Sequence, residues 1–297
     1  ERRHALAATR LADDPERLAG ADAVAHAVDG LGDALVGVEV RLQVAQQIAR
    51  RVDSDSVSLG SNPDVTVDLL PLLESRRRAG DALAIIGQVN DRMPFMFGAA
   101  RIPESAFDFI VDDPRDYHNL FSPPNLPITS ADHAIALAAS MLVRDGGTLQ
   151  IGIGELGDAI VHALTLRHAQ NALWRRVLMD TGIGPRFVKE RAEIGGDAPF
   201  AQGLYAVTEM FVDGFLDLYR AGILKRRVEP DGALLHGAFL LGPRAFYEEL
   251  RAMPDSERAL FQMMPVSFTN DLMGPGWEAK VAQRQHARFI NSAMMAT

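Results

Sequence analysis

The chain has 297 residues, and its content of 47% hydrophobic and 23% charged residues is that of a globular protein with a substantial core. A net charge of −9 argues against a nucleic-acid-binding protein. The absence of cysteine excludes disulfides and thiolate chemistry and fits a reducing compartment. The sequence shows no apolar run of membrane-spanning length and no signal-peptide-like segment, so we expect a cytoplasmic protein with no membrane partner.

The N-terminal part of the chain is predicted to be an α/β unit, and it is preceded by a segment rich in Ala, Asp and Arg. Apolar residues at helical spacing (Val40, Val44, Ile48 and Val52) predict a helix over residues 38–52. The elements predicted after it are a strand at 56–60, a helix at 65–78 and strands at 82–87 and 107–111. The strand at 82–87 is apolar throughout, which is typical of a strand buried on both faces.

Prolines cluster at residues 122–129 and indicate a linker between an N-terminal domain (1–121) and a C-terminal domain (130–297). In the second part the predicted strands are 148–151, 204–208, 233–239 and 261–265, and the predicted helices are 130–143, 158–166, 215–221 and 243–253. Strands that alternate with helices predict a parallel α/β sheet with ligands at the carboxyl ends of the strands. Residues 167–203 interrupt this alternation and are predicted to be an insertion, helical at 171–179 and loop-like at 181–185 and 194–197.

A glycine loop follows the strand at 148–151. Its sequence, Gly152-Ile-Gly154-Glu-Leu-Gly157, satisfies the G-x-G-x-x-G pattern of dinucleotide-binding loops. That pattern also requires a second strand ending in an acidic residue about 20 residues later, and residues 165–185 look helical instead. Three interpretations stay open: a nicotinamide or flavin site, a structural tight turn, and a loop that faces another anion or substrate.

Two further polar positions lie where predicted strands end. Glu209 follows the strand at 204–208 and is surrounded by apolar residues, where a carboxylate is costly unless it is paired or used. Gln88 and Asn90 follow the buried strand at 82–87. For Glu209 alone, a hydrogen bond to a neighbouring loop is the simpler explanation, and for Gln88 and Asn90 a plain turn is an equal alternative. The eight histidines form no closely spaced pair, so no metal site is expected.

These segments, in this order, resemble the acetyl-CoA hydrolase/transferase family, which includes the 4-hydroxybutyrate CoA-transferases, within the family I CoA-transferases. The similarity covers roughly residues 56–292, and it is carried by the segments 87–94, 145–154 and 208–214 and, more loosely, by 238–242 and 288–292. The most specific pieces are Leu-Gln-Ile-Gly-Ile-Gly at 149–154 and Thr-Glu-Met at 208–210.

The resemblance implies two related, open, mostly parallel α/β domains of the NagB/RpiA/CoA-transferase-like type, with acyl-CoA bound between them. It implies that Glu209 is the nucleophile, that Gly152 and Gly154 shape the loop near the thioester, and that Gln88 and Asn90 contact substrate. Coenzyme A would be a substrate, a small carboxylate the second partner, no cofactor would be needed, and a homo-oligomer is expected.

The resemblance leads to the function of a CoA-transferase or acyl-CoA hydrolase for short-chain acyl-CoA thioesters. The chain departs from the family pattern in Gly157, where many relatives carry proline, in the length of residues 165–203, and in ending before a second glycine-rich loop. We therefore expect a chain that is incomplete at both ends. The alternatives are a non-catalytic acyl-CoA-binding relative that lacks this loop and, more weakly, a dinucleotide-dependent oxidoreductase.

Overall fold

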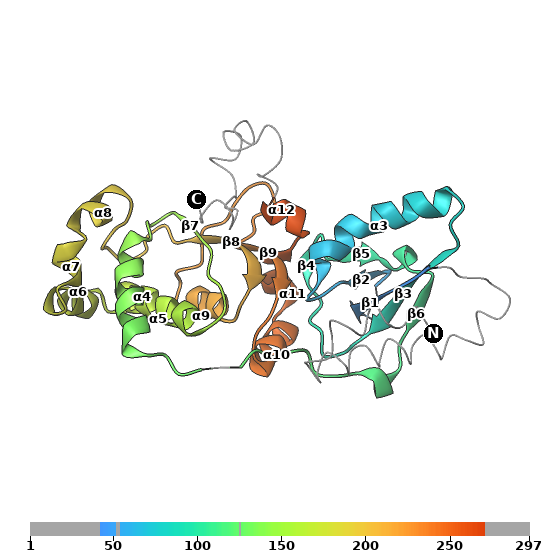
Figure 1. Cartoon of the computed structure of the whole chain (residues 1–297), viewed down its shortest axis with the longest axis horizontal. Coiled ribbons are helices and arrows are strands. Elements are labelled where there is room, and N and C mark those ends of the chain that lie inside the picture. Colours follow the sequence, from blue (N-terminus) through green and yellow to red (C-terminus); the bar gives the residue numbers. More distant parts are fainter. Residues whose placement is uncertain (1–41, 52–53, 125, 271–297) are drawn as a thin grey trace, which may run out of the picture.

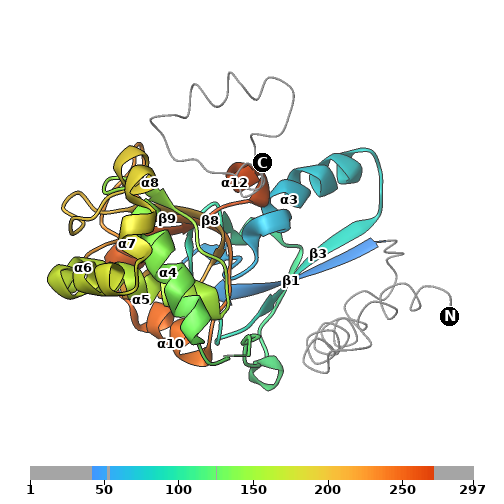
Figure 2. The ribbon, with the colours of Figure 1, turned by 60° about the vertical axis from the view of Figure 1, so that its left-hand side comes forward.

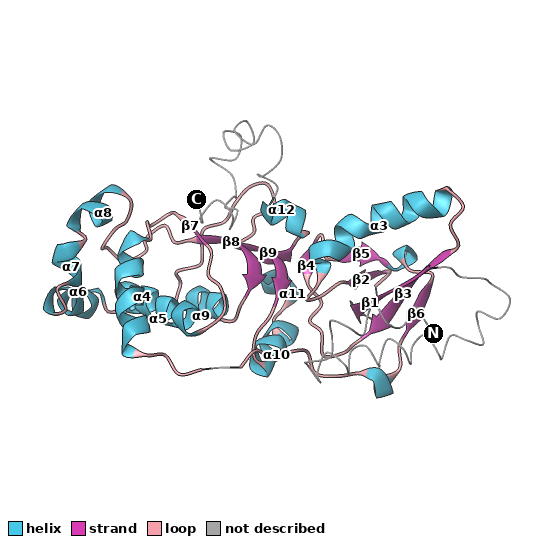
Figure 3. Ribbon diagram, in the orientation of Figure 1, coloured by secondary structure: helices cyan, strands magenta, loops and turns pink. Residues whose placement is uncertain are grey.

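The computed structural model describes residues 42–51, 54–124 and 126–270 (Figure 1). They form two five-stranded sheets that lie side by side, with helices packed around them (Figure 3). Six of the eight strand pairings are parallel. The prediction of an α/β fold is therefore confirmed, with one sheet parallel throughout and the other mixed.

The first sheet has the strand order β5-β2-β1-β3-β6. Its strands are β1 (Leu42–Arg50), β2 (Ser56–Ser58), β3 (Leu83–Val89), β5 (Arg101–Pro103) and β6 (Phe109–Val111). Strands β1, β3 and β6 are parallel, so their carboxyl ends meet at one edge, whereas β2 and β5 run antiparallel. Helix α3 (Pro63–Arg78) lies against this sheet, where the Thr66 hydroxyl donates to the Gln46 side chain at 2.8 Å.

Strand β1 occupies the segment for which a helix was predicted, so that prediction is wrong. Each residue from 42 to 48 pairs with β3, from Leu42 opposite Leu83 to Ile48 opposite Val89. Ile48 is fully buried beside Gly87, at which an added Cβ would lie 2.8 Å from the Ile48 side chain. The partner strand lies some forty residues away in sequence, so local spacing carries no signal of this pairing.

The second sheet is parallel throughout and has the order β4-β10-β9-β8-β7. Its strands are β4 (Phe97–Gly98), β7 (Thr148–Leu149), β8 (Tyr205–Phe211), β9 (Leu235–Leu240) and β10 (Phe261–Met263). Strand β4 precedes the predicted linker but pairs with β10, so the N-terminal part contributes a strand to the second sheet. The division of the chain at residues 122–129 stays a prediction.

Helices surround the second sheet. They are α4 (Ser130–Leu142), α5 (Glu155–Ala169), α6 (Asn171–Asp180), α7 (Ile183–Arg186), α8 (Val188–Glu193), α9 (Gly214–Arg220), α10 (Arg244–Ala252), α11 (Asp255–Arg258) and α12 (Val266–Asn270). The core includes Phe211, whose ring stacks on Phe261 and meets the edge of Phe246. Among the described residues, no helix has both the length and the apolar character needed to cross a membrane.

The segment 167–203, which was predicted to be an insertion between two strands, is largely helical. Helices α6, α7 and α8 project away from the sheets (Figure 2), and α7 begins within the stretch predicted to be a loop at 181–185. The buried guanidinium of Arg167 ties this region to α4, because it donates to the carbonyl oxygens of Ser140, Val143 and Ala198 at 2.6–2.9 Å. The predicted segments at 1–41 and 288–292 lie outside the described residues.

Candidate active site

Glu209 lies on β8, between β9 and the edge strand β7 of the second sheet. The prediction that the strand ends at Thr208 is wrong, because β8 continues to Phe211, with Met210 opposite Phe239 of β9. Glu209 is partly exposed, and no described side chain forms an ion pair or a hydrogen bond with its carboxylate. A carboxylate near the carboxyl end of a parallel strand, without an ion-pair partner, is available to react with a ligand.

The glycine loop lies beside this strand. Strands β7 and β8 pair in register up to Leu149 opposite Ala206, and continuing that register places Gly152 level with Glu209. Gly154 has a φ of 103° and occupies the N-cap position of α5. An added Cβ at Gly157 would lie only 2.3 Å from the Gly152 carbonyl oxygen, so the loop folds back tightly on the first turn of the helix.

The loop is poorly suited to a dinucleotide. The first turn of α5 carries two acidic residues, Glu155 and Asp158, where a pyrophosphate would need a positive field. Burial raises the pKa of Asp158, and the nearby Asp213, Asp217 and Glu155 raise it further. The described chain after α5 continues into helices α6 and α7, and no strand there supplies the acidic residue that would bind a ribose.

A cleft of about 1060 Å³ opens between the two sheets, next to the carboxyl end of β9. Its walls come from both parts of the chain, with the residues Gln46, Gln47, Ser61, Asn62, Asp64, Thr66, His118–Ser122, Phe239–Leu241, Arg244 and Tyr247. The backbone N–H of Leu240 donates to the Ser61 carbonyl at 3.1 Å, which joins β9 to the turn before α3. Strand β9 lines the cleft and pairs with β8, so the strand that carries Glu209 lies one strand away, and Glu209 is not among the residues that line the cleft.

Hydrogen bonds fix the orientation of two polar side chains in the cleft. The Tyr247 hydroxyl donates to the Phe121 carbonyl at 2.7 Å, and burial raises the pKa of Tyr247 to about 12, so it stays protonated. His118 lies with Nδ1 at 3.0 Å from the Asp116 carbonyl and Nε2 at 2.9 Å from the Gln47 amide nitrogen. A carbonyl only accepts, so the Nδ1 atom carries the proton and Nε2 accepts from Gln47.

Gln88 and Asn90 belong to the first sheet, and the structure places them apart from the strand pair that carries Glu209 and the glycine loop. The Asn90 side chain is committed to the backbone, donating to the His118 carbonyl at 3.0 Å and accepting from the Arg92 N–H at 3.1 Å. Gln88 is 1% exposed, and neither atom of its amide has a hydrogen-bond partner. A buried amide without hydrogen-bond partners is costly, so a ligand or water could supply the missing hydrogen bonds of Gln88.

Several cleft residues were not predicted as site residues. Ser61 and Asn62 follow the segment predicted as a strand at 56–60, and they lie in a turn that begins at Gly60, which has a φ of 57° and packs against Met93. His118 and Tyr247 gave no sequence signal, because each is an isolated polar residue whose place depends on the arrangement of the two sheets. Within the described part of the chain, no group of three or more metal-ligating side chains gathers.

No model of a known protein family matches the chain. Curated relatives do match it: the 4-hydroxybutyrate coenzyme A transferase of Clostridium kluyveri is 26% identical over 179 residues, which is 59% of this chain and 33% of the relative. The succinyl-CoA:cyclohexane-1-carboxylate CoA transferase of Geobacter metallireducens is 26% identical over 64% of this chain and 34% of the relative. A succinyl-CoA:acetate/propanoyl-CoA:succinate CoA transferase of Fasciola hepatica is 33% identical over 36% of this chain and 20% of the relative.

The chain is a homologue of the CoA-transferases. Solved structures show the same fold: RipA from Yersinia pestis has a TM-score of 0.54 at 23% identity, over 82% of this chain and 45% of RipA. The 4-hydroxybutyrate CoA-transferase of Porphyromonas gingivalis has a TM-score of 0.52 at 20% identity, over 82% of this chain and 49% of that structure. The chain spans about a third or less of the length of the curated relatives named here and under half of these two solved structures.

Proposed function

We propose that this chain is a CoA-transferase or acyl-CoA hydrolase that acts on short-chain acyl-CoA thioesters through Glu209. The observation that carries the proposal is the placement of a partly exposed carboxylate, with which no described side chain pairs, on a parallel strand beside a tight glycine loop and one strand away from the cleft between the sheets. The named relatives support it, since each is called a CoA transferase. The second partner would be a small carboxylate.

The proposed chemistry is nucleophilic catalysis by a carboxylate. A Glu209 oxygen attacks the thioester carbonyl carbon, the carbon–sulfur bond breaks, and CoA leaves as a thiolate from a mixed anhydride. The thiolate then attacks the glutamyl carbonyl and releases the acyl carboxylate, which leaves a glutamyl-CoA thioester. An incoming carboxylate repeats these two steps in reverse and departs as the new acyl-CoA, which regenerates the Glu209 carboxylate.

In this proposal the glycine loop stabilises the oxyanion that forms in each attack. Backbone N–H groups near Gly152 and Gly154 are suited to this because no side chain there blocks a close approach. Hydrolysis differs from transfer only in the final acceptor, because water in place of a carboxylate releases CoA and free Glu209. Water access to the cleft would therefore decide between the two activities.

The test is peptide mass mapping after incubation with acetyl-, propionyl- or butyryl-CoA. We expect a CoA-sized adduct on the peptide that contains Glu209, and we expect Glu209→Gln to remove the adduct and lower turnover by at least about 10³-fold. Glu190→Gln, at an exposed position of α8, is the matched control and should keep both. Full turnover by the Glu209→Gln variant would sink the proposal, and CoA binding without an adduct would support a non-catalytic acyl-CoA-binding protein instead.

A further inference from the structure

The pairing of β8 with its neighbour β9 is interrupted at Glu209. Residues 206–208 and 210–211 of β8 each pair with a residue of β9, as Thr208 does with Gly237, whereas no residue of the fully described strand β9 pairs with Glu209. Irregularities within a strand re-aim side chains, and β-bulges are over-represented next to active sites. The interruption therefore falls on the residue whose side-chain direction matters most to the proposed chemistry.

The hydrogen bonds from β8 to the β9 side change phase across this position. Before it, the Ala206 N–H donates to the Leu234 carbonyl at 2.9 Å, and after it, the Phe211 carbonyl accepts from the Leu241 N–H at 3.0 Å. In a regular strand, residues five apart direct their backbone groups to opposite neighbouring strands. Here both residues bond to the same side, so the backbone of β8 turns over between them.

The Thr208 hydroxyl holds the backbone on the far side of Glu209. It donates to the Met210 carbonyl oxygen at 2.8 Å and accepts from the Met210 backbone N–H at 3.3 Å. Hydroxyl side chains make such local contacts in competition with the hydrogen bonds between strands. The backbone that follows Glu209 is therefore held by the side chain that precedes it.

Burial keeps this hydroxyl in place. Thr208 is 1% exposed, and its side chain is stiff because it is branched at Cβ. The opposing Gly237 brings the strands close together, since an added Cβ there would lie 3.2 Å from the Phe211 Cβ. A buried hydroxyl also requires a hydrogen-bond partner, which Met210 supplies.

Valine would suit the buried position of Thr208 equally well as a strand residue. It has the same shape and a high strand propensity, and it carries no hydroxyl that must be satisfied. A buried polar group that local preferences do not require is expected where function needs it. The need that the structure shows is the irregular backbone at Glu209, the next residue along the chain.

We propose that Thr208 is a positioning residue for Glu209. Its hydroxyl holds the Met210 backbone out of regular pairing and thereby directs the Glu209 carboxylate to the thioester carbonyl carbon. The inference rests on the proposed function. Attack requires reacting atoms about 3–3.5 Å apart and aligned, and a displacement of about 1 Å can cost about 10²-fold in rate. Thr208 itself touches no substrate and acts through Glu209.

The first experiment compares steady-state kinetics of variants with butyryl-CoA and acetate. Thr208→Val removes only the hydroxyl, and we expect kcat to fall about 10–100-fold while the KM for butyryl-CoA stays within about threefold. Thr208→Ser keeps the hydroxyl and should retain kcat within about threefold. Thr181→Val is the matched control, because the Thr181 hydroxyl also donates to a backbone carbonyl, that of Val177 at 2.7 Å, but next to α6. An unchanged kcat in Thr208→Val, or equal losses in Thr208→Val and Thr208→Ser, overturns the proposal.

A second measurement does not depend on turnover. Amide hydrogen exchange followed by NMR should show faster exchange of the Met210 N–H in Thr208→Val, but not in Thr208→Ser or Thr181→Val. Unchanged exchange in β3, which belongs to the other sheet, shows that each variant is folded, and Thr208→Ala replaces Thr208→Val if the latter does not fold. Equal protection of Met210 in all variants overturns the role of the hydroxyl.

The two measurements also separate this inference from the proposed chemistry. If Glu209→Gln loses its turnover while Thr208→Val keeps its kcat, the positioning role fails and the nucleophile stands. If Glu209→Gln keeps full turnover, the nucleophile assignment fails, and the exchange of Met210 still reports whether Thr208 fixes this part of β8.

Discussion

Gly157 shows how a single hydrogen atom in place of a side chain shapes the glycine loop. Its φ is not in the left-handed region, so the requirement is one of space and not of backbone conformation. The Gly152 carbonyl oxygen occupies the position that a side chain at 157 would need. At Gly152 itself an added Cβ would meet nothing within 4 Å. The two glycines of one loop therefore have opposite tolerance for a methyl group.

We predict that Gly157→Ala lowers the free energy of unfolding by about 1–3 kcal/mol, because the helix and the Gly152 carbonyl must move apart. Gly152→Ala should change stability by less than about 0.5 kcal/mol, because it adds a methyl group in open space. Urea denaturation followed by circular dichroism measures both. Equal stability of the two variants would show that the loop is looser than the close contact at Gly157 implies.

At the scale of elements, Asp145 fixes the start of β8 relative to β7. Its carboxylate accepts from the backbone N–H groups of Ala201, Gln202 and Gly203 at 2.8–3.0 Å, immediately before β8, while Asp145 itself lies three residues before β7. Burial pushes the pKa of Asp145 upward, but the hydrogen bonds from these backbone N–H groups outweigh it and leave the pKa below its usual value. The Asp145 carboxylate thus fixes the backbone just before the strand that carries Glu209.

We predict that Asp145→Asn lowers the free energy of unfolding at pH 7 by about 1–3 kcal/mol, because a neutral amide accepts these hydrogen bonds less well. A carboxylate with a lowered pKa stabilises the fold above its unfolded pKa of about 3.9, and this contribution is lost as the pH falls through the folded value. The difference between the unmodified chain and the variant should therefore shrink at acid pH. Asp180→Asn, at an exposed position that ends α6, is the control, and a difference that persists at acid pH would contradict the role of the charge.

The elements that the sequence predicted well are those whose signals are local. The strand at β3 is a continuous apolar run, and the predicted helices at 65–78 and 130–143 match α3 and α4 to within two residues. The segment of β1 was predicted as a helix because its parallel partner is distant in sequence. Strands β4 and β5 have two and three residues, too short for any alternation, and they exist because neighbouring strands pair with them.

The site residues differ in the same way: those that belong to a local sequence pattern could be predicted, and those that meet only through packing could not. Glycines before a helix and a carboxylate among apolar residues are local patterns, so Gly152, Gly154 and Glu209 could be proposed from sequence. In the structure Glu209 lies on β8, and the two glycines lie in the loop between its neighbour β7 and helix α5. The roles of these three residues in chemistry and binding stay predictions. The ion pair between Arg51 and Asp255 could not be predicted, because these residues are 204 positions apart and meet only when the two sheets pack.

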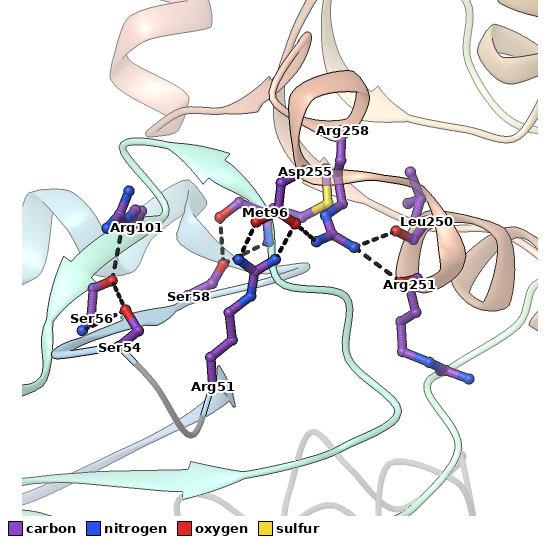
Figure 4. Close-up of polar contacts among 10 residues, drawn as sticks. All are labelled: Arg51, Ser54, Ser56, Ser58, Met96, Arg101, Leu250, Arg251, Asp255 and Arg258. Carbon is purple, nitrogen blue, oxygen red and sulfur yellow. Dashed lines mark hydrogen bonds and ion pairs between the residues drawn. The ribbon is translucent and has the colours of Figure 1, made fainter.

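At the scale of the whole molecule, two contacts stand out among those that join the sheets. The first is β4, which leaves the N-terminal part to pair with β10. The second is the ion pair from Arg51, which follows β1, to Asp255 at the start of α11 (Figure 4). Arg51 also stacks on Phe95, with its guanidinium carbon 4.2 Å from the ring centroid.

We predict that Asp255→Ala lowers the free energy of unfolding by about 1–3 kcal/mol. The reason is Arg258, whose side chain is 5% exposed and which would lose its carboxylate while staying buried. Glu248→Ala is the matched control, because Glu248 pairs with Arg244 on the exposed surface of α10, and such pairs contribute about 0.3–0.5 kcal/mol. Urea denaturation compares the two variants, and hydrogen exchange locates the effect: the amides of β1 and α11 should exchange faster in Asp255→Ala only. If both variants lose the same small amount, the contact between the sheets depends on β4 and the apolar core and not on this ion pair.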